Sequence, residues 1–284
     1  MSLPRSSLLA LAAPLAALLL GCQTTDEHPP FAAACQKNCP LLPGVIGGGS
    51  SAAGGSGSNP DSDAGTGTLQ GQVFQLTDAT FIPGSLYKQP ATVTADGANG
   101  SPVTATWTGV DPFDPFVLDG VARVAINWLG VEPEQIGGDA LPTYQALQTY
   151  QIATANLALV SATVLDGVFN AVSTLRSPDS GQVVVFFRSA GTNTPLSGLH
   201  VTMARAQEGI YRSATGWLLD DGTAVTDASG LVVFGNVDPA AAGSAQLITV
   251  TRAATTTMGA VAAGQFPVKV VQGAVSIASV GVQL

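Results

Sequence analysis

The chain has 284 residues, of which only 10% are charged, and its formal net charge is −9. Binding to a phosphate backbone requires clustered lysine and arginine, so this acidic balance argues against a nucleic-acid partner. The 33 glycines and 18 prolines, together with many threonines and valines, indicate short strands joined by turns rather than helices.

The first 21 residues have the layout of an export signal. Arg5 supplies a positive charge, and an uncharged apolar stretch over 6–21 follows it. This stretch is shorter than the roughly 20 residues that span a bilayer as a helix. Its small-residue end is typical of a cleavage site. We therefore expect residues 1–21 to be a signal peptide that is removed.

The end of this segment, Leu19-Leu20-Gly21-Cys22, resembles the lipobox of bacterial lipoproteins. The resemblance implies cleavage before Cys22, diacylglyceryl attachment to its thiol and acylation of the new N-terminus. Stable anchoring takes two lipid signals, and the three acyl chains that the resemblance implies supply more than that. The expected partner is therefore the lipid bilayer, reached through acylated Cys22. Gln23 stands where an Asp would hold an enteric lipoprotein at the inner membrane, which implies delivery to the outer membrane. The alternative is an ordinary signal peptide with an incidental cysteine.

Residues 22–68 contain a cysteine pair and then a tether. Cys35 and Cys39 leave an even count in an exported chain, which predicts a small disulfide-closed loop. A metal site would need two more ligands, and only His28 is near. From 44 to 68 the chain reads GVIGGGSSAAGGSGSNPDSDAGTGT, a Gly/Ser composition that predicts a flexible, disordered coil.

Two later ranges, 69–160 and 181–284, carry similar segments in the same order. The pairs are GQVF with GQVVVFF, PATVTA with LHVTMA, VLDGV with VFGNV, VARVAINW with AQLITVTR, and LPTYQAL with FPVKVVQ. A repeat of about 110 residues suits two tandem sandwiches better than a solenoid. Near the end, the apolar phase shifts from Val275 and Ile277 to Val280, Val282 and Leu284, which predicts a β-bulge.

Residues 161–177, between the two ranges, have a different period. Apolar residues recur there at three- and four-residue spacing, the mark of an amphipathic helix: Leu165, Val168, Phe169, Val172 and Leu175. Ser161 or Thr163 is expected to cap the helix, and Arg176 with Ser177-Pro178 to end it. The predicted fold class is therefore mainly β, with two tandem Ig-like or transthyretin-like antiparallel β-sandwiches and one connecting helix packed on one of them.

A second resemblance rests on the turn at 195–198 and on Thr226, Asp227, Gly230 and Phe234. A Pro-x-x-Gly turn before a Val-Thr strand, then a Thr-Asp-x-x-Gly turn leading into an aromatic-containing strand, is similar to the carboxypeptidase-regulatory-like, transthyretin-type β-sandwich. The collagen-adhesin B-type and bacterial Ig-like repeats share much of this pattern. The match covers 181–284 well and 69–160 poorly, because the first range lacks the second turn. The family implies a non-catalytic extracytoplasmic module and does not imply a ligand.

No catalytic, cofactor or metal motif is found, and we expect no catalytic residues, no cofactor and no bound metal. A Ser-His-Asp site would have to use His200, whose same-face neighbours offer no evident partner. Calcium stays open at two carboxylate groups without EF-hand spacing, namely Asp111, Asp114 and Asp119, and Asp220, Asp221 and Asp227. A turn bond to its own backbone two residues on explains Asp227 without an ion.

The aromatic residues bear on a binding role. Trp128 closes an alternating run and is expected in the core, whereas Trp217 is expected as a loop aromatic. A glycan platform would take two or three exposed aromatics on one face. The predicted function is a membrane-anchored, non-catalytic module of the cell envelope that is structural, scaffolding, or binds an envelope protein or glycan. The alternative is an envelope hydrolase with an unrecognised site.

Overall fold

The computed structural model describes residues 45–47, 65–110, 114–135, 137–150, 153–190, 192–239, 246–252 and 261–282. The predicted signal, Cys22, Cys35 and Cys39 lie outside them. Within the described residues the chain is mainly β, as predicted, and contains the α-helix α1 (Ala162–Ala171) and a short 3₁₀ turn, Ala98–Gly100. No helix in this part of the chain has the length and apolar character to cross a membrane.

The strands follow one another in two groups around the helix. The first group is β1 (Val45–Gly47), β2 (Thr66–Gly71), β3 (Val73–Leu76), β4 (Pro83–Leu86), β5 (Ala91–Asp96), β6 (Pro102–Trp107), β7 (Phe116–Ala122), β8 (Asn127–Pro133), β9 (Ala140–Leu141), β10 (Thr143–Leu147) and β11 (Leu157–Ser161). The second group is β12 (Gly181–Ser189), β13 (Leu199–Met203), β14 (Glu208–Ser213), β15 (Gly216–Leu219), β16 (Leu231–Val237), β17 (Gln246–Arg252), β18 (Val261–Val268) and β19 (Val275–Val282). Strand β1 lies within the predicted tether, where the sequence predicted a disordered coil and no strand.

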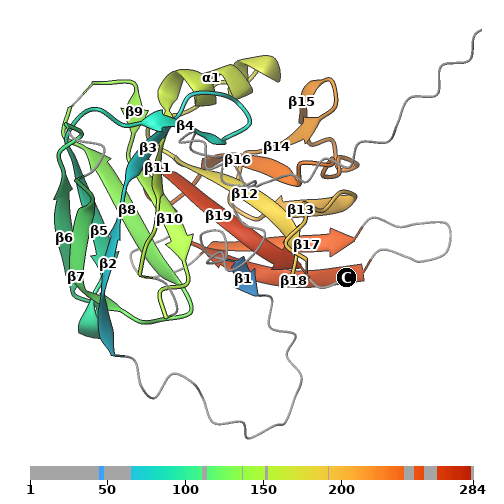
Figure 1. The fold of residues 1–284 in the computed structure, drawn as a ribbon. Helices are drawn as coiled ribbons and strands as arrows, with labels where there is room; N and C mark the ends of the chain where they lie inside the picture. Colours follow the sequence, from blue (N-terminus) through green and yellow to red (C-terminus); the bar gives the residue numbers. More distant parts are fainter. Residues whose placement is uncertain are drawn as a thin grey trace, which may run out of the picture.

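One sheet runs through both ranges (Figure 1). Its order is β15-β14-β16-β12-β19-β10-β8-β5-β6, with β1 also beside β19. The two ranges meet where β10 pairs in parallel with β19, with Thr143 opposite Val275. They therefore share a hydrogen-bonded ladder, and the division into two domains stays a prediction.

The sequence repeat has a counterpart in the strand pairing. In the first range β2 pairs with β7, and its continuation β3 pairs in parallel with β11, while β8 lies between β5 and β10. In the second range β12 pairs with β16 and in parallel with β19, while β17 lies between β13 and β18. The same ladder pattern occurs twice, although the sheets to which the strands belong differ.

The two faces of the large sheet are covered by different layers. The three-stranded sheet β13-β17-β18 packs on one face through a core that includes Val201, Phe234 and Ile248. On the opposite face, β2-β7 and the β3-β11 pair enclose a core with Trp107 and Leu129. The central strands are consequently buried on both sides.

Strand β19 shows this double burial, because all eight of its residues are buried. Its register with β12 runs without a shift from Gln182 opposite Val275 to Ser189 opposite Val282. The predicted bulge is therefore wrong. Val275 and Val280 pack into cores on opposite faces of the sheet. A strand that is covered on both faces is apolar throughout, so a change in its apolar alternation does not indicate a bulge.

Helix α1 begins as predicted, with the Ser161 hydroxyl accepting from the backbone N–H of Val164 at 3.3 Å. Its buried residues Leu165, Val168 and Phe169 share a core with residues of both ranges, rather than of one sandwich. The helix is shorter than the predicted 161–177, because the chain leaves helical geometry after Ala171. Leu175, expected on the apolar face, is 80% exposed.

The Thr-Asp-x-x-Gly turn closes one edge of the three-stranded sheet. Thr226 is buried, and its hydroxyl accepts from the N–H of Leu199 at 3.0 Å and donates to the carbonyl of Leu196 at 2.8 Å. Gly230 has a φ of +67°, and a Cβ there would lie 2.3 Å from the carbonyl oxygen of Phe187. The turn therefore needs both a hydroxyl and a glycine.

Candidate functional site

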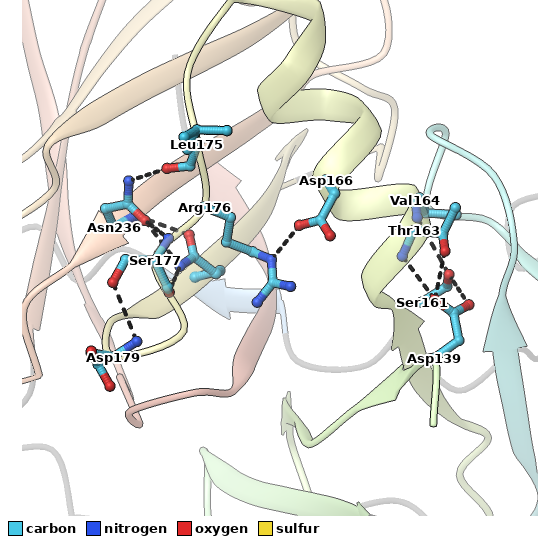
Figure 2. A network of polar contacts seen from close by, with 11 residues as sticks. Asp139, Ser161, Thr163, Val164, Asp166, Leu175, Arg176, Ser177, Asp179 and Asn236 are labelled. Atoms are coloured by element: carbon cyan, nitrogen blue, oxygen red, sulfur yellow. Dashed lines mark hydrogen bonds and ion pairs between the residues drawn. The ribbon is translucent and has the colours of Figure 1, made fainter. Parts of the chain in front are cut away.

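A polar network surrounds the helix where the two ranges meet (Figure 2). Asp139, which precedes β9, accepts the backbone N–H of Thr163 at 2.9 Å and the Thr163 hydroxyl at 2.7 Å, and the Ser161 hydroxyl donates to its other oxygen. Burial opposes ionisation of this carboxyl, but the hydrogen bonds outweigh it, so the pKa of Asp139 lies below its ordinary value. A carboxylate at a helix N-terminus also complements the helix dipole.

Asn236 on β16 organises the other half of the network. The residue is 4% exposed, and its side chain donates to the carbonyl of Leu175 at 2.9 Å and accepts the N–H of Ser177 at 2.6 Å. Its φ of 48° is a left-handed geometry that Asn tolerates better than most residues. Arg176 pairs with Asp166 of the helix at 2.7 Å. The segment 175–177 after the helix is thus bound both to β16 and to the helix itself.

These groups satisfy one another and the backbone, which is the pattern of a structural network. It holds the first range, the helix and the second range in one arrangement. The carboxylate of Glu208 extends the network by accepting from Asn236 through Oε1 at 3.2 Å, while its other oxygen is buried without a partner among the described residues.

The candidate histidine has a neighbour that the sequence did not reveal. His200 on β13 lies 3.9 Å, measured from Nε2 to Oδ2, from Asp220, which follows β15. Among the described residues Nε2 has no hydrogen-bond partner. A nucleophile–base pair would place a hydroxyl or thiol about 2.6–3.2 Å from this nitrogen. The described part of the chain therefore contains an isolated His–Asp pair and no triad.

The candidate calcium groups are engaged in turns and surface bonds. Asp220, Asp221 and Asp227 each accept a backbone N–H two residues on, from Gly222, Thr223 and Ser229 respectively. The bond expected for Asp227 is confirmed.

In the other group, Asp119 accepts the hydroxyl of Thr68 at 2.7 Å, Asp114 is exposed and Asp111 lies outside the described residues. No set of three or more His, Cys, Asp or Glu residues within the described ranges is grouped to hold a metal ion.

The tryptophans do not form a platform. Trp128, expected in the core, is only partly buried at the rim of the core beneath β13-β17-β18. Trp217 is not a loop residue but part of β15, where it packs edge-on against Phe81 with ring centroids 6.3 Å apart. Trp107 is buried and donates to the carbonyl of Tyr87 at 2.8 Å.

A surface that the sequence analysis missed lies on the large sheet beyond its three-stranded cover. We name it the threonine face; its residues project from β5, β6, β8 and β10, and they are Thr92, Thr94, Thr104, Thr106, Glu132 and Tyr144. The opposite side of these strands forms the core with Trp107. The alternation in TVT and TAT was the available signal, because two such strands paired in register align their hydroxyls.

Tyr144 lies at the β10 end of this face and is held there by two side-chain contacts. Its hydroxyl donates to Glu132 at 3.0 Å, and the ammonium of Lys269 lies 4.5 Å from the ring centroid. Burial, the hydrogen bond and the charge of Glu132 together raise the pKa of Tyr144 to about 12. The phenol stays protonated, so the group can bind but is not suited to act as a nucleophile near neutral pH.

No protein-family model matches the chain, and no curated protein matches it either. Among solved structures it is similar to shaft pilin SpaA from Lactobacillus rhamnosus GG, with 11% identity, 75% of this chain and 97% of that chain covered, and a TM-score of 0.21. A streptococcal ancillary pilin (11% identity, 76% and 62% covered, TM-score 0.20) and the group B streptococcus pilus 2b backbone protein (10%, 69% and 79%, 0.21) are similar to the same degree. Likeness at this level carries no argument about function.

Proposed function

We propose that the chain is a lipid-anchored, non-catalytic module of the bacterial cell envelope, in which a stiff β body serves as a scaffold or spacer and presents a binding face to an envelope protein or glycan. The observation that supports this is the joining of the two ranges by a shared ladder, a shared core and a buried polar network. A body of this kind keeps its two ends at a fixed separation. The threonine face is the polar surface that it offers.

The anchor is tested by fatty-acid labelling in a bacterial host. The wild type should carry a clickable fatty acid, and the Cys22→Ser variant should not. A labelled serine variant would exclude the anchor. Fractionation of the labelled protein tests the expected outer-membrane location, and retention in the inner membrane would contradict it.

The binding role is tested with the full chain carrying Cys22→Ser, immobilised against purified envelope glycans and envelope extract. A saturable partner should be retained and then lost in Thr104→Glu/Thr106→Glu, which places two carboxylates on the threonine face. Thr215→Glu, at the exposed turn between β14 and β15, is the matched control. Equal retention by both variants would remove the threonine face from the proposal.

The hydrolase alternative rests on the proximity of His200 and Asp220. A panel of ester, amide and glycoside substrates tests it with the wild type, His200→Ala and Asp220→Ala. We expect no turnover. Turnover that both substitutions abolish would replace the binding module with an enzyme.

A further inference from the structure

The edge of β19 that faces away from β12 is shared by two strands. β10 pairs with it at Val275, Ser276 and Ile277 only. Further along, Val45 and Ile46 of β1 pair in parallel with Ser279 and Val280. Figure 1 shows β1 next to β19 at the foot of the large sheet.

This part of the edge requires a partner. With β1 beside them, residues 279–281 are buried, with exposed fractions of 7% for Ser279 and 0% for Val280. Buried backbone N–H and C=O groups that are left unpaired destabilise a fold, and an open edge of an apolar strand attracts another strand. β10 ends too early along β19 to satisfy them.

The chain carries a short segment with strand propensity in a region that otherwise has little of it. Val45 and Ile46 are β-branched and apolar, whereas the stretch that follows them, GGGSSAAGGSGS, has little strand propensity. Adding an extended segment to a free sheet edge is a general mode of peptide recognition, in which the backbone provides binding and alternate side chains provide selectivity.

We propose that the β19 edge at residues 279–281 is a strand-binding site whose ligand is the chain's own Val45–Gly47 segment, and that its docking shortens the tether. The second part rests on the proposed lipid anchor. With the segment docked, the 23 residues from Gln23 to Val45 separate the lipid from the body; with it released, the 44 residues from Gln23 to Thr66 do so. At about 3.3–3.6 Å per residue, the maximum reach falls from about 150 Å to about 80 Å.

The site is tested by disulfide trapping in the full chain with Cys22, Cys35 and Cys39 replaced by Ser. Val45→Cys with Ser279→Cys places the two thiols opposite each other on one face, within the Cα separation that a disulfide accepts. Val45→Cys with Val280→Cys is the matched control, because successive residues of a strand point to opposite faces. Mild oxidation should form an intrachain disulfide at least tenfold faster in the first variant.

Equal rates in the two variants would overturn the strand-binding site. A disulfide that forms only between chains would also overturn it, because the occupant would then be a second copy. The Ser279→Cys single variant should have the same melting temperature as the parent chain in which Cys22, Cys35 and Cys39 are replaced by Ser. This comparison separates a failure to fold from a failure to dock.

These results do not depend on lipidation, so they can fail while the anchor stands. The tether claim is tested in the lipidated chain that keeps Cys22, by energy transfer between a membrane dye and a dye on the body. Locking Val45→Cys to Ser279→Cys should bring the dyes closer than in a Val45→Asp/Ile46→Asp variant, because two carboxylates oppose docking beside the buried residues 279 and 280. An unchanged distance would overturn the shortening.

Discussion

The Tyr211 hydroxyl covers the edge of strand β13 within the protein interior, and its removal should lower the free energy of unfolding. The side chain extends from β14 and is fully buried, and its hydroxyl reaches β13, the outer strand of the three-stranded sheet. The hydroxyl accepts the backbone N–H of Val201 at 2.8 Å and donates to the carbonyl of the same residue at 2.6 Å. One side-chain oxygen thus bonds both backbone groups of Val201, which lies on the outermost strand of its sheet in the part of the chain that the structure describes.

Tyr211→Phe leaves both groups of Val201 buried without a partner. A buried donor or acceptor that loses its partner costs about 1–3 kcal/mol, so the substitution should lower the free energy of unfolding by about 2–4 kcal/mol. At about 2–4 °C per kcal/mol for a chain of this size, the melting temperature should fall by about 5–15 °C. Chemical and thermal unfolding followed by circular dichroism measure both quantities.

Tyr144→Phe is the matched control. It also removes one phenolic oxygen, but its partner Glu132 lies on the exposed sheet face and can hydrogen-bond to water instead. We expect a loss of less than about 1 kcal/mol. Equal losses in the two variants, or a loss under about 0.5 kcal/mol for Tyr211→Phe, would refute the assignment of Tyr211 as the cover of the β13 edge.

Further predictions concern pH, the junction and cooperativity. Burial raises the pKa of Tyr211, and burial with Glu132 raises that of Tyr144. As the pH rises, these tyrosines therefore ionise first in the unfolded chain, so the free energy of unfolding should be constant below about pH 10 and fall above it. The fall should be shallower in Tyr211→Phe. The lowered pKa of Asp139 has the opposite sign: its contribution is present above its unfolded pKa and is lost as the pH falls through the folded one, and Asp139→Asn should remove this acid dependence in urea titrations. Asn236→Ala should destabilise by about 2–4 kcal/mol, because it orphans backbone groups and places Ala at a positive φ. Calorimetry should show one unfolding transition, because the two ranges share a ladder and a core; two resolved transitions would contradict the shared-core interpretation.

Local signals in the sequence predicted local structure well. The spacing of Leu165, Val168 and Phe169 identified the helix and its buried face, and Ser161 identified its cap, because both depend on residues within one turn. The end of the helix was misplaced because Leu175 continues the spacing by chance. There the backbone has already turned, with Ser173 at a φ of 59°.

Contacts between distant segments were not predictable. The parallel pairing of β10 with β19 and the closeness of His200 to Asp220 depend on how sheets are stacked, which no residue spacing encodes. The threonine face was missed for a related reason. The alternation at TVT and TAT was visible in the sequence, but which of the two strand faces would be covered was not.

The place where the two ranges meet follows from unpaired edges. In the first range β11, the counterpart of β19, has β3 on one side and β9 on the other, so its neighbours come from the same range. In the second range β19 has β12 on one side, and its other side is filled by β10 of the first range and by β1. Bending the body at this boundary would break backbone hydrogen bonds to β19 and expose Val275 and Ile277 to water. The β10 and β1 strands that complete the edge of β19 therefore also resist bending between the two ranges, as the proposed spacer role would require.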